Sequence, residues 1–304
     1  MNQKKKTVTI GIPAFNEEGS IVNLIKSLLI QERDGFILKK IVISSDGSED
    51  NTVQAVRTFK NKLIKIIDNK DRQGQGARQN QIVKLYRTDV LVLINADMVI
   101  KDRKFLKKLV GPIIRGQSDL TAANFEPTPS DGFFDRIITT GLNYKKSVYE
   151  GFQNGNNWYT CRGAARAFSR RFYSKLNFKR SVGEDLYTYL LCTSLGWKYR
   201  FVKGAVIYGK MPTNFTDHKR QSSRFFSSGS IVQKEFNPEF LKKYCVWPMK
   251  QLILQGLKML LTHPVEMFLY PLIVILVKVF ILLDREMGES DIWQVAKSSK
   301  IINV

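Results

Sequence analysis

The chain has 304 residues, of which 43% are hydrophobic, so it can bury a sizeable core in one large domain or two, and a largely disordered protein is excluded. Its 48 lysines and arginines face 27 acidic residues, and the formal net charge of +21 favours an anionic partner: a phosphorylated metabolite, a membrane surface or nucleic acid. The basic residues are spread along the chain without a recognisable nucleic-acid-binding motif, so a nucleic-acid binder rests on charge alone and is not expected.

Residues 7–95 alternate between strand-like and helix-like segments. The segments "TVTIGIPAF", "KKIVISSD", "LIKIID" and "DVLVLIN" are typical of strands, and "EEGSIVNLIKSLL", "NTVQAVRTF" and "GARQNQIVKLY" are typical of helices. This alternation predicts an α/β fold with a parallel sheet covered by helices, which continues to about Glu126. A ligand site is then expected at the carboxyl ends of the strands.

Unusual polar segments follow each of the four predicted strands. They are "PAFNEE" at 13–18, "SDGSEDN" at 45–51, "NKDRQGQGARQ" at 69–79 and "NADM" at 95–98. Taken singly, each has an ordinary explanation, since Asn and Asp favour turns and acidic residues cap helices. The glycines of the third segment let a ligand approach the backbone, but the segment is neither a Walker P-loop nor a dinucleotide fingerprint.

Residues 131–208 continue the mixed pattern. A helix is expected over "DRIITTGLNYKKSVYEG", followed by an Asn/Gly-rich loop and by "VGEDLYTYLL", where the adjacent acids Glu184 and Asp185 begin a helix. Helix capping explains one of these acids; two together, with burial, can raise a carboxylate pKa toward the range of a general base. After Gly209 the periodicity is lost, which predicts a mobile segment near the site, with His218 in a solvated loop.

The region beyond about Phe236 is more apolar. Its segment "WPMKQLILQGLKMLLTH" is amphipathic, and "PVEMFLYPLIVILVKVFILLDRE" has just the length of a membrane span but contains Glu266, Pro271 and Lys278. A span and a helix lying in the interface both remain open, and either would hold residues 247–283 at a membrane.

The beginning of the chain and its three cysteines indicate the cellular compartment of the protein. The apolar run near the start is short and stopped by Pro13, so no signal peptide is expected. Cys161, Cys192 and Cys245 are too far apart in sequence to suggest a disulfide framework or a metal cluster, which favours a reduced, cytosolic setting.

Taken in order, the motifs form a stronger signal. Pro13 to Glu17, Asp46 to Asp50, Gly74 to Asn80, Asn95 to Asp97, and Glu184-Asp185 together resemble the family-2 glycosyltransferases, which have the GT-A fold. The resemblance covers roughly residues 7–225. "QSSRF" at 221–225 is similar to the Gln-x-x-Arg-Trp motif of membrane-bound, often processive members, with Phe225 in place of Trp.

The resemblance implies a Rossmann-like mixed sheet sandwiched by helices in a catalytic domain at 1–235, and the apolar composition beyond it predicts a helical membrane-associated region at 236–304. It implies an inverting transfer from a nucleotide-diphosphate sugar, most often a UDP-sugar, to a hydroxyl of a glycan, lipid-linked or membrane-associated acceptor. The nucleotide-sugar contacts implied are Pro13, Ala14, Phe15, Asn16, Glu17, Asp46, Gly74, Arg78, Asn95, Ala96, Asp97, Gln221 and Arg224.

The resemblance also implies roles in catalysis. Asp185 would be the general base and Glu184 its orienting neighbour, while Asp97 would bind Mg²⁺ or Mn²⁺. Asn95 replaces the first acid of the family's Asp-x-Asp metal motif, so metal affinity is expected to be weaker. His218 is a second candidate ligand for the metal or the diphosphate, with the loop histidine as the alternative.

Two other functions remain open. A processive polysaccharide synthase is favoured by "QSSRF" and the apolar tail, and a non-catalytic nucleotide-sugar-binding module is favoured by the altered metal motif. Retention of both Glu184 and Asp185 argues against the second. The expected location is the cytoplasmic face of the cell membrane.

Overall fold

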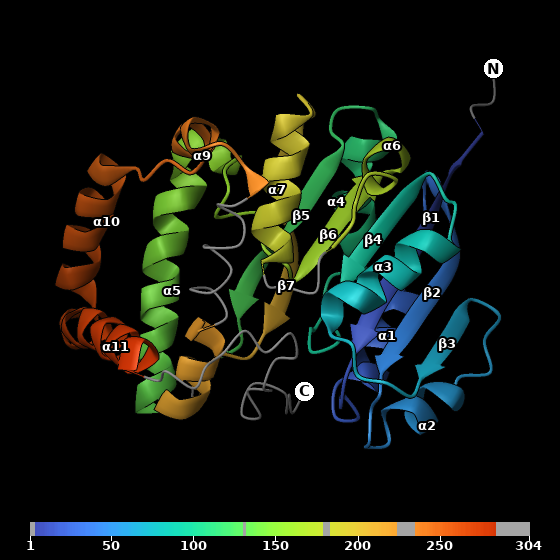
Figure 1. The fold of residues 1–304 in the computed structure, drawn as a ribbon, viewed down its shortest axis with the longest axis horizontal. Coiled ribbons are helices and arrows are strands. Elements are labelled where there is room, and N and C mark those ends of the chain that lie inside the picture. Colours follow the sequence, from blue (N-terminus) through green and yellow to red (C-terminus); the bar gives the residue numbers. More distant parts are fainter. Residues whose placement is uncertain (1–3, 130–131, 179–182, 224–234, 284–304) are drawn as a thin grey trace.

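A computed structural model describes residues 4–129, 132–178, 183–223 and 235–283. It contains a seven-stranded sheet of order β3-β2-β1-β4-β6-β5-β7, with helices on both faces (Figure 1). The strands are β1 Lys6–Ala14, β2 Phe36–Asp46, β3 Ile64–Asn69, β4 Val90–Ile94, β5 Leu120–Pro127, β6 Ala165–Ser169 and β7 Tyr199–Gly209. The predicted α/β fold is confirmed.

The sheet is mixed. Strands β1 to β4 pair in parallel, while β6 runs antiparallel to both β4 and β5. The four strands predicted over residues 7–95 are therefore confirmed as a parallel unit. All five residues of β4 are buried, which explains its continuous apolar sequence, because a central strand covered on both faces has no polar side.

Helices cover the sheet in two layers. Apolar side chains of α1 (Ile21–Leu29) and α4 (Phe105–Ile114) join one core cluster, and those of α3 (Gln75–Leu85), α6 (Arg170–Tyr173) and α7 (Glu184–Ser194) join the other. The helix α2 (Thr52–Arg57) packs beside β3. Gly11 permits the close approach of α3 to β1, because a Cβ atom there would lie 2.7 Å from Ile82 Cγ2.

The remaining helices gather at one end of the sheet (Figure 1). They are α5 (Phe133–Gly151), the 3₁₀ turn η1 (Phe152–Gly155), α9 (Pro238–Tyr244), α10 (Met249–Thr262) and α11 (Pro264–Leu283). The helices α10 and α11 pack against α5: the Tyr144 hydroxyl donates to the Leu252 carbonyl at 2.9 Å, and Gly141 leaves room for the Tyr270 ring. The domain boundary at 235/236 stays a prediction.

The helix α11 is, among the described helices, the one long and apolar enough to cross a membrane. Most of its apolar side chains are exposed in this chain rather than packed in the core. The exposed apolar residues of α10 and α11 include Met249, Ile253, Leu254, Leu257, Leu260, Leu261, Val265, Phe268, Leu272, Ile275, Leu276, Val279, Phe280, Leu282 and Leu283.

Candidate active site

The candidate site lies at the carboxyl end of β1. On one side of β1 the chain continues into the neighbouring strand β2, and on the other side the neighbour is β4. The carboxyl ends of these parallel strands form one edge of the sheet. A crevice at such a point is the usual ligand site of open α/β sheets. Pro13 and Ala14 are buried at the end of β1, and pairing with β4 stops at Gly11, so the missing N–H of Pro13 costs no bond to β4.

The loops after β1 and β2 hold each other in place. The Asn16 backbone N–H donates to Ser48 Oγ at 3.2 Å, and the side-chain Oδ1 of Asn16 accepts from the Glu49 backbone N–H at 2.9 Å. Asn16 has φ = 52°, a conformation that asparagine tolerates better than most residues. The buried Glu17 donates its N–H to Thr52 Oγ1 at 2.7 Å. These polar residues thus build a fixed rim.

Turn formation explains one acid of this rim. Asp50 Oδ1 accepts from the Thr52 N–H at 3.0 Å, immediately before α2 begins. Asp50 therefore forms a turn before α2, whose N-cap residue is Asn51 and makes no side-chain cap bond. Phe15 is half-buried, and the Arg72 guanidinium stacks over its ring with Cζ 3.9 Å from the centroid, which joins the first and third polar segments.

Asp46 organises the third polar segment. Its carboxylate accepts from the backbone N–H groups of Gln73 and Gly74, both at 2.8 Å, and from Arg78 Nε at 2.6 Å. Both charged side chains are only 6% exposed. Gly74 has φ = 88° and ψ = 163°, a conformation that is essentially limited to glycine. Asp46 and Arg78 therefore shape the turn that begins α3.

The tip of β4 carries Asn95, Ala96 and Asp97. Asn95 Oδ1 accepts from Gln75 Nε2 at 3.0 Å, and the Asn95 N–H donates to the Ala164 carbonyl at 3.0 Å. Ala96 is buried, whereas Asp97 is half-exposed. The tip is thus anchored on both sides and presents one carboxylate at the edge.

The start of α7 carries the two adjacent acids. Gly183 adopts a left-handed conformation (φ = 97°) and turns the chain into the helix, of which Glu184 and Asp185 are the first two residues. Both acids are half-buried. Asp185 Oδ1 accepts from the Leu186 N–H at 2.8 Å, and the positive end of the helix dipole favours the carboxylate there.

Arg166 of β6 donates hydrogen bonds to the first turn of α7. Its side chain is fully buried, and Nη1 donates to the Glu184 carbonyl at 2.7 Å and to Thr188 Oγ1 at 2.8 Å. Its Nε and Nη2 atoms have no hydrogen-bond partner in the described part of the chain. A buried guanidinium with idle donors is costly, so Arg166 is a candidate for function as well as structure.

Residues 163–166 connect the β4 tip with the start of α7, and they were not predicted from the sequence. Ala164 bonds to Asn95 at the β4 tip, while a Cβ atom at Gly163 would lie 3.9 Å from Asp185 Cβ. The segment thus lies against both the tip and the start of α7. Its signal was present in "CRGAARAF", where three small residues separate two arginines just before and at the start of the buried strand β6.

Comparison with known proteins agrees with this geometry. Residues 9–176, more than half of the chain, match the profile of glycosyl transferase family 2. The chain belongs to this family. The protein is therefore a glycosyltransferase that acts on nucleotide sugars.

Related glycosyltransferases come from several organisms. The chain is 27% identical over 242 residues to the O-antigen chain rhamnosyltransferase RfbN of Salmonella typhimurium, with 75% of each chain covered. It is 25% identical to glucosyl-3-phosphoglycerate synthase of Mycobacterium tuberculosis, but over only 41% of this chain and 39% of that protein.

Among solved structures, the mannosyltransferase PcManGT of Pyrobaculum calidifontis, in complex with GDP-Man and Mn²⁺, superposes with a TM-score of 0.67. It is 16% identical, with 93% of this chain and 89% of that chain covered. TarS of S. aureus, residues 1–349, gives 0.53 at 16% identity, with 84% and 72% covered. These likenesses establish the GT-A-type fold of this glycosyltransferase.

The β4 tip of this glycosyltransferase fits a metal held jointly with substrate. Mg²⁺ is usually bound by one or two carboxylates together with substrate phosphates, and Asp97 supplies one half-exposed carboxylate. In the described residues no group of three or more His, Cys, Asp and Glu side chains could hold a metal by itself. Metal binding here would therefore depend on the donor diphosphate.

His218 lies elsewhere than expected. Residues 215–223 form a helix, so the prediction of a mobile segment with a solvated loop histidine is wrong for this part. His218 packs edge-on against Phe134 with the ring centroids 6.1 Å apart, because both belong to helices that meet there. Burial, and then Lys145, lower the pKa of His218 to about 4. Its role as a metal ligand stays a prediction.

Gln221 and Arg224 are the two contacts predicted in the "QSSRF" motif. Gln221 is half-buried in the helix over 215–223. Arg224 lies outside the described residues. Cys161 lies beside the active-site segment, and burial raises the pKa of its thiol to about 12, which disfavours the reactive thiolate.

Proposed function

We propose that this glycosyltransferase inverts the anomeric centre while moving a sugar from a nucleotide-diphosphate sugar, most often a UDP-sugar, to a hydroxyl of a glycan, lipid-linked or membrane-associated acceptor. One observation carries the proposal. Residues 163–166 contact both the β4 tip, through Asn95, and the start of α7, through Glu184 and Asp185. Diphosphate and acceptor can therefore meet at one edge.

The nucleotide would lie over the rim built from the first three polar segments. Ala14, Phe15 and Glu17 would border the base and ribose, together with Asp46. Gly74 and Arg78 would form the far wall, where the left-handed turn brings backbone close to the ligand. Pro13, Asn16 and Ala96 would add further contacts to the donor, and Asn16 also ties the loops after β1 and β2 together.

The diphosphate would lie at Asn95 and Asp97. Mg²⁺ or Mn²⁺, when bound, would neutralise the charge that develops on the departing nucleotide diphosphate. Asp97 would hold that ion with the phosphates, and Asn95 would add a neutral donor. Gln221 and Arg224 would complete the phosphate contacts, with Arg224 as a second positive clamp.

Asp185 would remove the acceptor proton as the acceptor oxygen attacks the anomeric carbon on the face opposite the diphosphate. The Leu186 N–H holds one of its oxygens at 2.8 Å. Arg166 fixes the backbone of the preceding residue, Glu184, which would orient the base. A carboxylate held in this way has little freedom to turn away from the acceptor hydroxyl.

The test is Asp185→Asn. Asparagine keeps an oxygen that can accept from Leu186, so α7 should begin unchanged, but transfer should fall by about 10²- to 10⁴-fold because the base is lost. Nucleotide and sugar release would be measured across a panel of UDP- and GDP-sugars, with and without membrane lipid extract, and donor affinity by calorimetry.

Glu184→Gln is the matched control, since it removes the neighbouring charge and should cost much less. Full transfer by Asp185→Asn would remove Asp185 from the mechanism. If the wild-type chain neither binds nor turns over any donor of the panel, the proposed function fails as a whole.

Asp97→Ala separates metal-dependent binding from chemistry. The variant should bind the donor equally weakly with and without Mn²⁺, while the wild type should bind it more tightly with Mn²⁺, because the shared ion is held by Asp97. Calorimetry with a nucleotide diphosphate measures this without turnover. Asn95→Asp should increase the effect of Mn²⁺; a metal effect retained in Asp97→Ala would contradict this assignment.

We also propose that residues 247–283 hold the enzyme at the cytoplasmic face of the cell membrane. The support is the exposed apolar surface of α10 and α11, which water does not favour. Loss of membrane binding after deletion of 247–283 would test it. Product length in membranes would separate single transfer from a processive synthase.

A further inference from the structure

The apolar side chains of α11 form two faces. The inner face packs against α5, where Tyr270 joins a buried cluster with Ile137 and Ile138. The outer face is exposed, and its residues follow one another mostly at the helical spacing of three and four: Val265, Phe268, Leu272, Ile275, Leu276, Val279, Leu282 and Leu283. Within the described residues, the chain itself covers only the inner face.

Contacts hold α11 against the rest of the chain at two separate points. The Tyr270 ring fills the space above Gly141 of α5, where a Cβ atom would overlap the ring. Ten residues further on, Phe280 packs edge-on against Phe215, with the ring centroids 5.7 Å apart. Ten residues correspond to about 15 Å along a helix axis. The helix α11, of 20 residues, is therefore held along half of its length rather than at one end.

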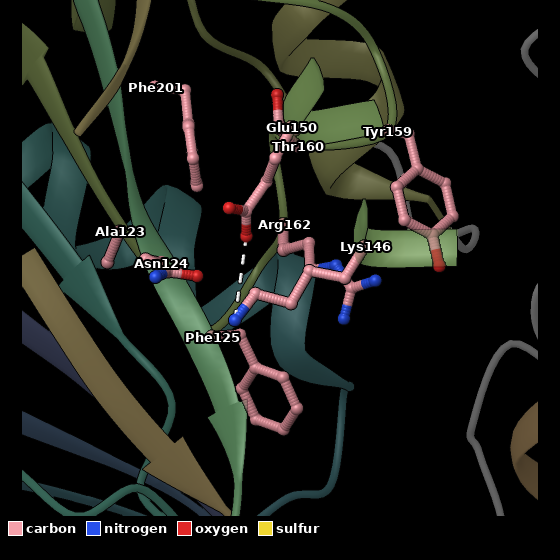
Figure 2. Close-up of a pocket in the computed structure, with 9 residues that line it drawn as sticks. All are labelled: Ala123, Asn124, Phe125, Lys146, Glu150, Tyr159, Thr160, Arg162 and Phe201. Atoms are coloured by element: carbon pink, nitrogen blue, oxygen red, sulfur yellow. Dashed lines mark ion pairs between the residues drawn. The ribbon is translucent and has the colours of Figure 1, made fainter. Parts of the chain in front are cut away.

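The helix α5, on which α11 lies, carries charged side chains. Figure 2 shows Lys146 and Glu150 of α5 beside β5, joined by an ion pair with Nζ and Oε1 3.5 Å apart. Lys146 is also paired with Glu126 of β5. Toward α11, Lys145 Nζ lies 5.4 Å from the centroid of the Tyr270 ring. A cation therefore lies directly against α11.

A membrane-spanning α11 would carry these charges into the bilayer. Tyr270 and Val277, the two buried residues of α11, are the seventh and fourteenth of its 20 residues. In a span both would lie about 5 Å from the bilayer centre. Lys145 would then lie in hydrocarbon, where a charged group is strongly disfavoured. The packing of α11 on α5 is therefore incompatible with a span.

A flat orientation avoids this conflict. A helix in the membrane plane places its outer face at the border between headgroups and acyl chains, while the inner face stays on the protein. By helical spacing, Lys278 falls between the two faces of α11, so its ammonium group can stay at the level of the headgroups. Trp247, exposed just before α10, is of the type enriched at this level.

The charge of this region favours a lipid surface over a second copy of the chain. Residues 235–283 contain three glutamates and five exposed lysines, Lys242, Lys243, Lys250, Lys258 and Lys278. In a symmetric dimer through this region, the lysines of one copy would meet those of the other, and like charges repel. Anionic headgroups attract the same lysines.

We propose that α11 does not cross the bilayer and instead lies flat in the headgroup region of an anionic leaflet, with its outer face toward the acyl chains. The inference rests on the proposed membrane attachment of residues 247–283 and gives it a geometry. The inner face keeps its contacts with α5 in the bound state, so the catalytic domain has a fixed orientation on the membrane.

The first experiment measures depth along α11 in the full chain. Val265, Leu272 and Val279 are exposed and seven residues apart, so they share the outer face. Val265→Cys, Leu272→Cys and Val279→Cys each receive a fluorescent label, and lipids spin-labelled at different depths quench it in vesicles of phosphatidylcholine and phosphatidylglycerol. The three labels should lie at one depth. In a span, the label at 272 would lie near the bilayer centre and that at 265 about 10 Å nearer to one surface.

The native cysteines give a low background for this label. Cys161 and Cys192 are buried and Cys245 is partly buried, and burial raises the pKa of all three thiols, which slows their reaction near neutral pH. The wild-type chain treated with the same reagent is the blank. Thermal melting shows whether each labelled variant is folded.

The second experiment measures vesicle binding by cosedimentation. The wild type should bind phosphatidylcholine alone about tenfold more weakly than the mixed vesicles. Ile275→Glu should weaken binding to the mixed vesicles about tenfold or more, because an acid replaces an apolar side chain of the outer face. Ile30→Glu is the matched control, since Ile30 is 58% exposed and Ile275 is 56% exposed; it should bind as the wild type does. Leu276→Glu guards against misfolding of Ile275→Glu.

Four results would overturn the inference: a label at 272 deeper than the other two, equal binding to both vesicle types, wild-type binding by both outer-face variants, or a lipid-free dimer that Ile275→Glu dissociates. The first would leave the membrane attachment standing without the flat orientation. Normal nucleotide-sugar binding in any of these cases would leave the proposed transfer reaction standing. Absence of that binding in the wild type would instead count against the transfer reaction.

Discussion

The two halves of the sheet edge treat their polar groups differently. At β1 to β3, the Asp46 carboxylate accepts three hydrogen bonds from the chain itself, and the loops after β1 and β2 are bonded to each other. At β5 and β6, Asn124 Oδ1 and the Nε and Nη2 atoms of Arg166 are buried without a hydrogen-bond partner in the described residues. The chain itself satisfies the Asp46 carboxylate and ties the loops around it together, whereas Asn124 and Arg166 keep buried polar atoms that its described residues do not satisfy.

The two halves should also differ in how their buried charges affect the free energy of unfolding. A buried ion pair is stable only when its remaining donors and acceptors are satisfied, as they are around Asp46. A buried charge with idle donors, such as Arg166, contributes less to stability and is retained more easily for function. Substitutions in the two halves should therefore separate stability from activity.

The largest expected effect on stability is that of Asp46→Ala. It leaves Arg78 buried and unpaired, so the free energy of unfolding should fall by about 3–5 kcal/mol, measured by urea denaturation. The double variant Asp46→Ala, Arg78→Met should recover most of this loss, because it removes both charges. A loss below about 1 kcal/mol, as for an exposed pair, would show that the first half is not the preorganised one.

Arg166→Met tests the second half. It should lower kcat by about 10- to 100-fold, since α7 would begin in a shifted position, while donor affinity stays unchanged. The free energy of unfolding should change less than in Asp46→Ala. Partial rescue of kcat by Arg166→Lys would support a positioning role that needs the charge. If Arg166→Met lost as much stability as Asp46→Ala and kept its kcat, the two halves of the sheet edge would not differ in this way.

The smallest effect concerns His218, which packs against Phe134 of α5. Its pKa of about 4 in the folded chain lies below the ordinary value of 6.5, so the unfolded chain binds a proton that the folded chain excludes between these values. The free energy of unfolding should therefore fall as pH drops from about 6.5 toward 4. His218→Gln should have a shallower slope in chemical denaturation over this window; identical slopes would mean that His218 is solvated.

The first half was largely predictable from sequence. Apolar runs followed by polar segments identified β1 to β4 and put Asp46, Asn95 and Asp97 at one edge, because parallel strands with short crossovers share an orientation. The order of the motifs identified the family. The turn at Asp50 was also predictable, since Asp and Asn bond to nearby backbone.

The second half was less predictable. Residues 163–166 bring Asn95 and Asp185 together only because β6 inserts antiparallel between β4 and β5, a pairing that local pattern does not specify. Irregular spacing concealed the helix over 215–223, and tertiary contact with Phe134, rather than periodicity, buries His218.

By itself, the sequence determined the strand and helix alternation, the edge that carries the chemistry and the acids at its tips, because these depend on local hydrophobic period and turn chemistry. Only the tertiary structure decided which of those groups are satisfied by the chain. Asp46 and Asp185 are both acids at the ends of local elements, yet Asp46 is closed off by Gln73, Gly74 and Arg78, whereas Asp185 remains half-buried beside Gly163. Whether a buried polar group finds hydrogen-bond partners depends on residues distant in sequence, which come together only when the chain folds.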